Sequence, residues 1–214
     1  MSAQELNPPK NSNQIIEERR AKLKVLRESG TAFPNDFRRN HFASDLHKKY
    51  GDQSNITLEK NPVSVEVAGR MILKRVMGKA SFATIQDMSG HIQLYITNDT
   101  TGESSHAAFK NYDLGDILGI QGILFITKSG ELTVRVINLR LLTKSLRPLP
   151  EKFHGLIDQE QKYRQRYLDL ISNEETRKVF LTRSRIIQSI RAFFEEKGYL
   201  EVETPMMHHI PGGA

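Results

Sequence analysis

The sequence contains no cysteine, which excludes both a disulfide framework and a thiolate zinc site. Long hydrophobic runs are also missing. The longest apolar stretches, such as 117–127, are far shorter than the roughly 20 residues of a membrane-spanning helix. The first residues, MSAQELNPPKNSNQ, are polar and lack the apolar core of a secretory signal. We therefore expect a cytoplasmic protein that does not bind a membrane.

Negative charge is the minority charge in this chain. The 31 Lys and Arg residues outnumber the 25 Asp and Glu residues, which gives a net charge of +6 and a pI near 9.5. A basic balance favours polyanionic partners, because Lys and Arg gain affinity by displacing counterions from phosphates. Charge alone does not identify the partner, since many basic domains bind no nucleic acid.

The N-terminal part is predicted to be helical after a disordered start over residues 1–12. Apolar residues recur at near-helical spacing over 13–29, and Gly30 suits the end of that helix. Its remaining surface is basic, which indicates either a solvated face or a contact with a nucleic-acid backbone. A second, short helix is expected from Ser44, as its N-cap, to Gly51.

From Val63 the apolar pattern changes to a period of two, which is typical of strands. The segment KASFATIQDMSGHIQLYITND, residues 79–99, predicts a hairpin that turns at 88–90. Two further strands are expected over 116–127 and 131–143, and Gly69 marks a bend or bulge in the first. Five strands within about 80 residues, with a connection after the third, favour a small OB-fold barrel.

Alternation places the side chains of this hairpin on two faces. Ala83, Ile85, Ile92, Leu94 and Ile96 form the core face. Phe82 and Gln93 lie on the outer face, and Glu131, Thr133 and Arg135 are expected to face outward on the last strand. Phe82, Gln93 and Glu131 therefore form a candidate pocket for an unpaired base, with Phe82 as the stacking ring. The alternative is that Phe82 packs under a loop or another domain. His91 and Tyr95 share the outer face without an assigned role.

The C-terminal part begins with a charged segment that contains Pro148 and Pro150. Residues 174–198 are predicted to form a long amphipathic helix that ends at Gly198. YLEVETPMM, residues 199–207, is expected to be a strand that Pro205 stops. One helix and one strand cannot close a core alone, so we expect their apolar side chains to pack on a further part or a partner subunit.

These segments resemble a known family. EEKGYLEVETPMM is similar to motif 1 of class II aminoacyl-tRNA synthetases. An OB barrel before motif 1 is typical of the subgroup for aspartate, asparagine and lysine. The segments GRMILKRVMGKASFATIQDMSGHIQLY and RPLPEKFHGLIDQEQKYRQRYLDLISN resemble lysyl-tRNA synthetases of bacterial type. The resemblance covers nearly the whole chain beyond residue 13 and implies the N-terminal part of such a synthetase.

The resemblance implies roles for six residues. The ring at Phe82 stacks on the central anticodon base, a uracil, while Gln93, Glu131 and Arg75 contact the anticodon. The backbone near Gly213 meets the lysine substrate, since a glycine permits close approach. Motif 1, which ends at Pro205, builds the dimer interface.

The implied fold class is α+β, in four parts. Residues 1–61 are a disordered start and helical extension, 62–146 the OB-fold anticodon-binding domain, and 147–172 a linker. Residues 173–214 hold the first helix and strand of the class II catalytic domain.

The resemblance also implies an activity for the full-length protein, which joins lysine to ATP with Mg²⁺ and transfers it to tRNA(Lys) as a homodimer. The ATP-binding motifs 2 and 3 are expected beyond residue 214, so we predict no catalytic or metal-binding residue and no aminoacylation in this chain. Two alternatives stay open. One is a non-catalytic OB module that binds single strands without sequence preference, and the other is an aspartyl- or asparaginyl-tRNA synthetase relative.

Overall fold

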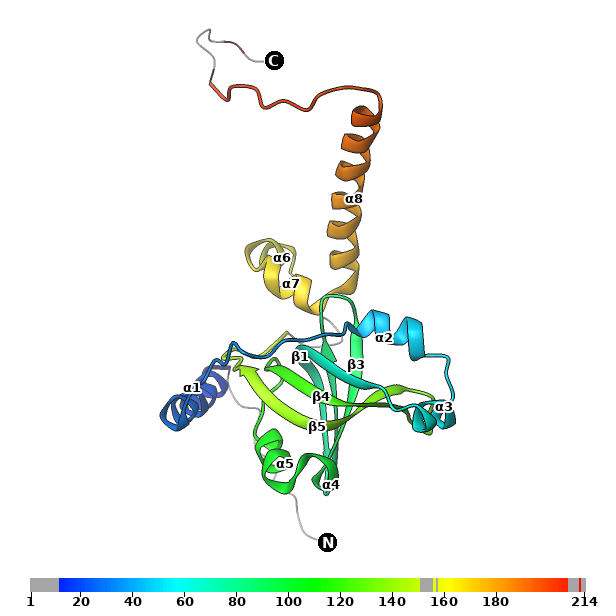
Figure 1. Ribbon diagram of the computed structural model, residues 1–214. Helices are drawn as coiled ribbons and strands as arrows, with labels where there is room; N and C mark the ends of the chain where they lie inside the picture. The colour runs from blue at the N-terminus through cyan, green and yellow to red at the C-terminus, as the bar shows by residue number, and fades with distance from the viewer. Residues whose placement is uncertain (1–11, 151–155, 157, 208–211, 213–214) are drawn as a thin grey trace. The chain divides into compact units, whose positions relative to one another are not determined.

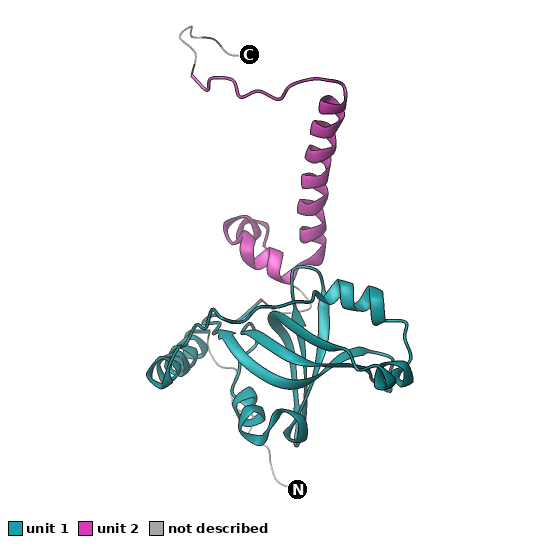
Figure 2. Ribbon diagram, in the orientation of Figure 1, with its two compact units in different colours: residues 1–149 teal, residues 150–214 magenta. Residues whose placement is uncertain are grey.

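The computed structural model describes residues 12–150, 156, 158–207 and 212. The chain divides into two compact units, residues 1–149 and 150–214 (Figure 2). The finer division into four parts stays a prediction.

Within residues 12–149, the first unit forms a five-stranded barrel and five helices (Figure 1). The three helices before the barrel are α1 (Ser12–Ser29), α2 (Ala43–Tyr50) and α3 (Asn55–Lys60). The five strands are β1 (Ser64–Met77), β2 (Ala80–Gln86), β3 (His91–Thr97), β4 (Ile117–Ile126) and β5 (Leu132–Thr143). The connection between β3 and β4 carries α4 (Asn98–Thr101) and α5 (Glu103–Lys110).

The strands close into a barrel in the order β1-β2-β3-β5-β4. All neighbouring pairs are antiparallel except β3 and β5, which pair in parallel. This arrangement confirms the five-stranded OB-fold barrel and the crossover after the third strand. Helices α4 and α5 lie at one end of the barrel (Figure 1).

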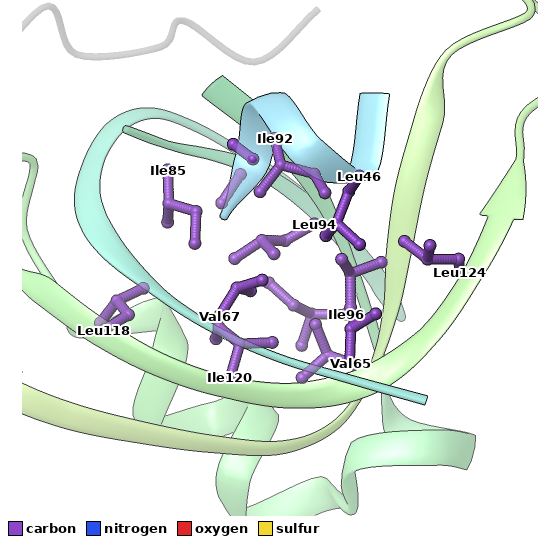
Figure 3. Packing of buried hydrophobic residues seen from close by; sticks show 14 of the residues in the cluster. Leu46, Val65, Val67, Ile85, Ile92, Leu94, Ile96, Leu118, Ile120 and Leu124 are labelled. Carbon is purple, nitrogen blue, oxygen red and sulfur yellow. The ribbon is translucent and has the colours of Figure 1, made fainter. Parts of the chain in front are cut away.

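Apolar side chains from all five strands fill the barrel interior (Figure 3). The five hairpin residues expected in the core are all buried, with exposures of 2% or less. Gly69 allows a close approach of two strands, because a Cβ there would lie 2.7 Å from the main-chain oxygen of Gln86. The register shift of β1 falls between Met71 and Leu73, just beyond the bend expected at Gly69.

The turn of the β2–β3 hairpin is fixed by the carboxylate of Asp87. Its Oδ1 accepts hydrogen bonds from the main-chain N–H groups of Ser89 and Gly90, at 2.7 and 2.9 Å. Its Oδ2 accepts the N–H of Ala43 at 2.8 Å. Burial raises the pKa of Asp87, but these hydrogen bonds outweigh it and hold the pKa below its usual value.

The same turn corrects the prediction that Ser44 is the N-cap of the second helix. Helix α2 begins at Ala43, and Phe42 is its N-cap without a side-chain hydrogen bond. The N–H of Ser44 donates to Ser89 Oγ at 3.0 Å. The first N–H groups of α2 are therefore satisfied by the hairpin, so the helix does not need a capping side chain of its own.

Two basic side chains of helix α1 bind segments that flank strands β4 and β5 of the barrel. Arg19 is buried, and its Nη1 donates to the carbonyls of Ser145 and Arg147 at 3.3 and 2.9 Å. Lys22 Nζ lies 2.8 Å from Asp113 Oδ1. These two side chains therefore bind other residues of the first unit. A contact with a nucleic-acid backbone is left to the remaining basic residues of α1.

The described residues of the second unit form three helices, which are α6 (Gln159–Arg164), α7 (Arg166–Ser172) and α8 (Glu174–Glu196). Arg177 Nη1 ties α8 to the end of α7 by donating to the carbonyls of Leu170 and Ile171, at 2.8 and 3.1 Å. The long helix is confirmed, and its apolar side chains are exposed. They include Phe180, Ile186, Ile187, Ile190, Phe193 and Phe194.

The strand expected over 199–207 is not formed. These residues, Pro205 among them, are exposed and have no regular secondary structure. A strand requires a neighbouring strand to satisfy its backbone groups, and the described residues of this unit form none. Among the described residues, no helix is long and apolar enough to cross a membrane.

Candidate nucleic-acid interface

The outer face of the barrel carries two parallel rows of side chains that run across the strands. The first row crosses β1, β2, β3 and β5 as Arg75, Phe82, Tyr95 and Arg135, each the register partner of the next. Two aromatic rings are therefore flanked by two guanidinium groups. This order results from the period-two alternation in each strand together with the parallel pairing of β3 and β5.

The second row lies beside the first and is more polar. It crosses β2, β3, β5 and β4 as Thr84, Gln93, Thr133 and Phe125. The hydroxyl of Thr133 donates to Gln93 Oε1 at 2.9 Å. The sequence predicts an outward-facing Thr133, and the structure places it on that face but covers it completely, with 0% exposure.

Three rings from the two rows form an aromatic cluster. The Phe82 and Tyr95 centroids are 5.0 Å apart, and those of Tyr95 and Phe125 are 5.8 Å apart. Arg135 lies over the Phe125 ring, with its guanidinium carbon 4.9 Å from the centroid. Phe82 is only half-buried, so a ring surface remains accessible for stacking.

The rows border a hollow of about 870 Å³ on this face. Phe82, Gln93 and Arg75, three of the predicted site residues, line it. Side chains from the turn between β4 and β5 also line it, among them Lys128. The hollow therefore combines aromatic rings, an amide and several cations, which is the chemistry that binds unpaired nucleotides.

Glu131 lies beside this hollow and is not part of its lining. It is exposed and directly precedes β5. Its main-chain carbonyl lies 3.1 Å from the hydroxyl of Thr133, so it is connected to Gln93 through that threonine. The structure thus brings Phe82, Gln93 and Arg75 together and places Glu131 at the rim.

Sequence reasoning missed one member of this surface and assigned no role to two others. Phe125 is absent from the predicted site, although its alternation with the buried Leu124 places it on the outer face. Arg135 was predicted to face outward without a role. Tyr95 received none, and only the pairing of β3 with β5 shows that it is the centre of the aromatic cluster.

Two other predicted site residues belong to the second unit. Gly213 falls outside the described residues, and Pro205 is exposed in the second unit. His91 shares the outer face, and its main-chain oxygen lies 3.0 Å from His47 Nε2, within hydrogen-bond distance. In the part of the chain that the structure describes, no group of three or more His, Cys, Asp or Glu side chains is placed to hold a metal ion.

Comparison with known proteins connects this surface to a family. Residues 65–142 match the OB-fold nucleic acid binding domain, and residues 158–214 match the class II tRNA synthetases for D, K and N. A lysine–tRNA ligase of Nitrosomonas europaea is 67% identical over 95% of this chain. The chain is homologous to lysine–tRNA ligases.

Further ligases show similar identities. The lysine–tRNA ligase of Thiobacillus denitrificans is 63% identical over 97% of this chain, and that of Laribacter hongkongensis is 60% identical over 100% of this chain. The chain spans 41% of the length of the first two ligases and 43% of the third. The matched parts therefore include an OB-fold domain over residues 65–142 and a class II synthetase segment over residues 158–214.

Proposed function

We propose that this chain is the tRNA-recognition part of a lysine–tRNA ligase, and that the hollow on the outer face of the barrel binds the anticodon of tRNA(Lys). The observation that supports this most strongly is the row of Arg75, Phe82, Tyr95 and Arg135. It offers an accessible ring between cations at the site where the OB fold binds oligonucleotides.

Each of the four anticodon-binding residues has a separate task. Phe82 stacks on the central anticodon base, a uracil, and excludes water from one of its faces. Gln93 hydrogen-bonds the edge of that base, and Glu131 accepts a hydrogen bond from a neighbouring base at the rim. Arg75 binds the anticodon region from its position beside Phe82, where its charge attracts the phosphate backbone.

The full-length ligase is proposed to activate lysine with ATP and Mg²⁺ and to transfer it to tRNA(Lys) in the cytoplasm. We propose that ATP and Mg²⁺ bind to motifs 2 and 3 of the full-length ligase, and we assign no residue of this chain to either. The exposed apolar side of α8, together with Pro205, is proposed to lie at the homodimer interface. Gly213 is proposed to meet the lysine substrate.

A hairpin RNA with the anticodon UUU tests this function. Replacing its central uracil with cytosine is expected to weaken binding about tenfold, because one hydrogen-bonded base edge is mismatched. Fluorescence anisotropy of labelled hairpins against the 214-residue chain measures both affinities at one fixed salt concentration, since phosphate contacts are salt-dependent. A hairpin altered only in its stem is the control.

A second candidate function is binding of single strands without sequence preference. The cations around the hollow and the accessible Phe82 ring favour it equally well, because every base has a face that can stack. The two functions differ in the central-base experiment. Equal affinity for the uracil and cytosine hairpins would contradict anticodon recognition and support the second function.

A further inference from the structure

Thr133 is an unusual member of the outer face, because it is polar, faces outward and is nevertheless fully buried. It lies between Gln93 on β3 and Phe125 on β4 in the second row. A hydroxyl removed from water in this way must find its hydrogen-bond partners within the protein. Two acceptors lie close to it.

The hydroxyl of Thr133 has one hydrogen to donate. Gln93 Oε1 is 2.9 Å away, and the main-chain oxygen of Glu131 is 3.1 Å away. The Glu131 oxygen already receives the N–H of Thr127 at 3.0 Å and its hydroxyl at 3.3 Å. Thr133 therefore donates its hydroxyl hydrogen to the closer acceptor, Gln93 Oε1.

This hydrogen bond fixes which way the Gln93 amide faces. An amide has one accepting end and one donating end. When Oε1 is held by Thr133, the NH₂ group remains for the hollow that Gln93 lines. The hollow then presents a donor to a bound base at this point.

We propose that Thr133 is a positioning residue that makes the hollow select a base with a carbonyl group at C4 over a base with an amino group at C4. Uracil presents a carbonyl oxygen at this position, which accepts from the Gln93 NH₂ group. Cytosine presents an amino group at the corresponding edge, and two donors then face each other without an acceptor. This inference rests on the proposed function and adds the reason why Gln93 can tell the two bases apart.

The test compares Thr133→Val with Thr133→Ser in the 214-residue chain. Valine has nearly the same shape but cannot donate, whereas serine keeps the hydroxyl. Each variant is titrated with the uracil and the cytosine hairpins, and the ratio of the two affinities is the readout. Thr143→Val, at the other end of β5, is the matched control, and circular dichroism verifies the fold of every variant.

We expect the ratio to fall from about ten in the wild type towards one in Thr133→Val, since a freed amide can rotate to serve either base. Affinity for the uracil hairpin should change by less than about threefold, because rotation preserves its hydrogen bond. Thr133→Ser and Thr143→Val should keep the wild-type ratio. A purely structural role of Thr133 would weaken both hairpins equally and leave the ratio unchanged.

Two results distinguish a failure of the Thr133 proposal from a failure of the proposed function. A wild-type ratio near ten that persists in Thr133→Val overturns the role of Thr133 and leaves anticodon recognition standing. A wild-type ratio of one overturns both.

Gln93→Glu provides a second measurement that does not disturb Thr133. A carboxylate only accepts, so this variant should favour the cytosine hairpin, and a retained preference for uracil would contradict the proposed orientation.

Discussion

Replacing Phe82 with alanine is expected to weaken binding of the UUU hairpin by about 1–3 kcal/mol, roughly 5- to 150-fold, which is the range of one base–aromatic stacking contact. The ring is half-buried and lies between Arg75 and Tyr95 in the first row. Alanine keeps the backbone in register and removes the stacking surface. Fluorescence anisotropy with the labelled hairpin measures the loss.

Three further variants separate stacking from packing. Phe82→Tyr keeps the ring and should bind like the wild type, whereas Phe82→Leu keeps apolar volume but loses the ring and should resemble alanine. Phe33→Ala removes an exposed ring that does not line the hollow, and it should leave affinity unchanged. Unchanged affinity in Phe82→Ala itself would show that no base stacks at this position.

The second large effect is expected from a buried charge cluster that joins three segments of the first unit. Lys144 Nζ lies 2.7 Å from Asp116 Oδ1 and 2.6 Å from Asp113 Oδ2, and the side chains of Lys144 and Asp116 are almost completely buried. Asp116 also accepts the N–H of Ser145 at 2.8 Å. Lys22 of α1 binds the same Asp113.

Asp116→Asn should destabilise the barrel by about 3–5 kcal/mol, because removing one partner of a buried ion pair leaves the other charge incompletely compensated. The remaining contact of Lys144 with Asp113 places the effect at the lower end of this range. Amide hydrogen exchange in β1 and β4 measures it in the barrel alone, without the second unit. No change in protection would contradict this account of the cluster.

The exposed pair of Arg140 and Asp36, 2.8 Å apart, is the control. Asp36→Asn should not change the exchange measurably, since water screens that pair.

The pH dependence of stability provides a second readout in the wild type. Burial raises the pKa of Asp113, but hydrogen bonds from Lys144 and Lys22 outweigh it and hold the pKa below its usual value. Its stabilisation is therefore present above the unfolded pKa and is lost as pH falls through the lowered folded pKa.

Local pattern was sufficient to predict the faces of the hairpin. Alternation alone separates Phe82 and Gln93 from the buried Ile85 and Leu94, because neighbouring residues of a strand point to opposite sides. The turn at 88–90 could be predicted as well, because Ser89 and Gly90 are residues that favour turns. These features depend on residues that are close in the sequence.

Features that depend on distant partners could not be predicted. Phe125 and Arg135 join the site only because β5 pairs with both β3 and β4. The ion pair of Lys144 with Asp116 spans 28 residues, and the capping of α2 by the hairpin spans more. The strand expected at 199–207 failed for a related reason, since alternation indicates an apolar face but supplies no neighbouring strand.

The central claim is that the central anticodon base stacks on Phe82. A UUU hairpin with 5-iodouridine at the central position tests it most directly, because photo-crosslinking marks the side chain that contacts the base. Mass spectrometry of the crosslinked 214-residue chain should locate the adduct at Phe82 or the adjoining Tyr95, 5.0 Å away between ring centroids. Adducts confined to α1 or to the second unit would contradict the account.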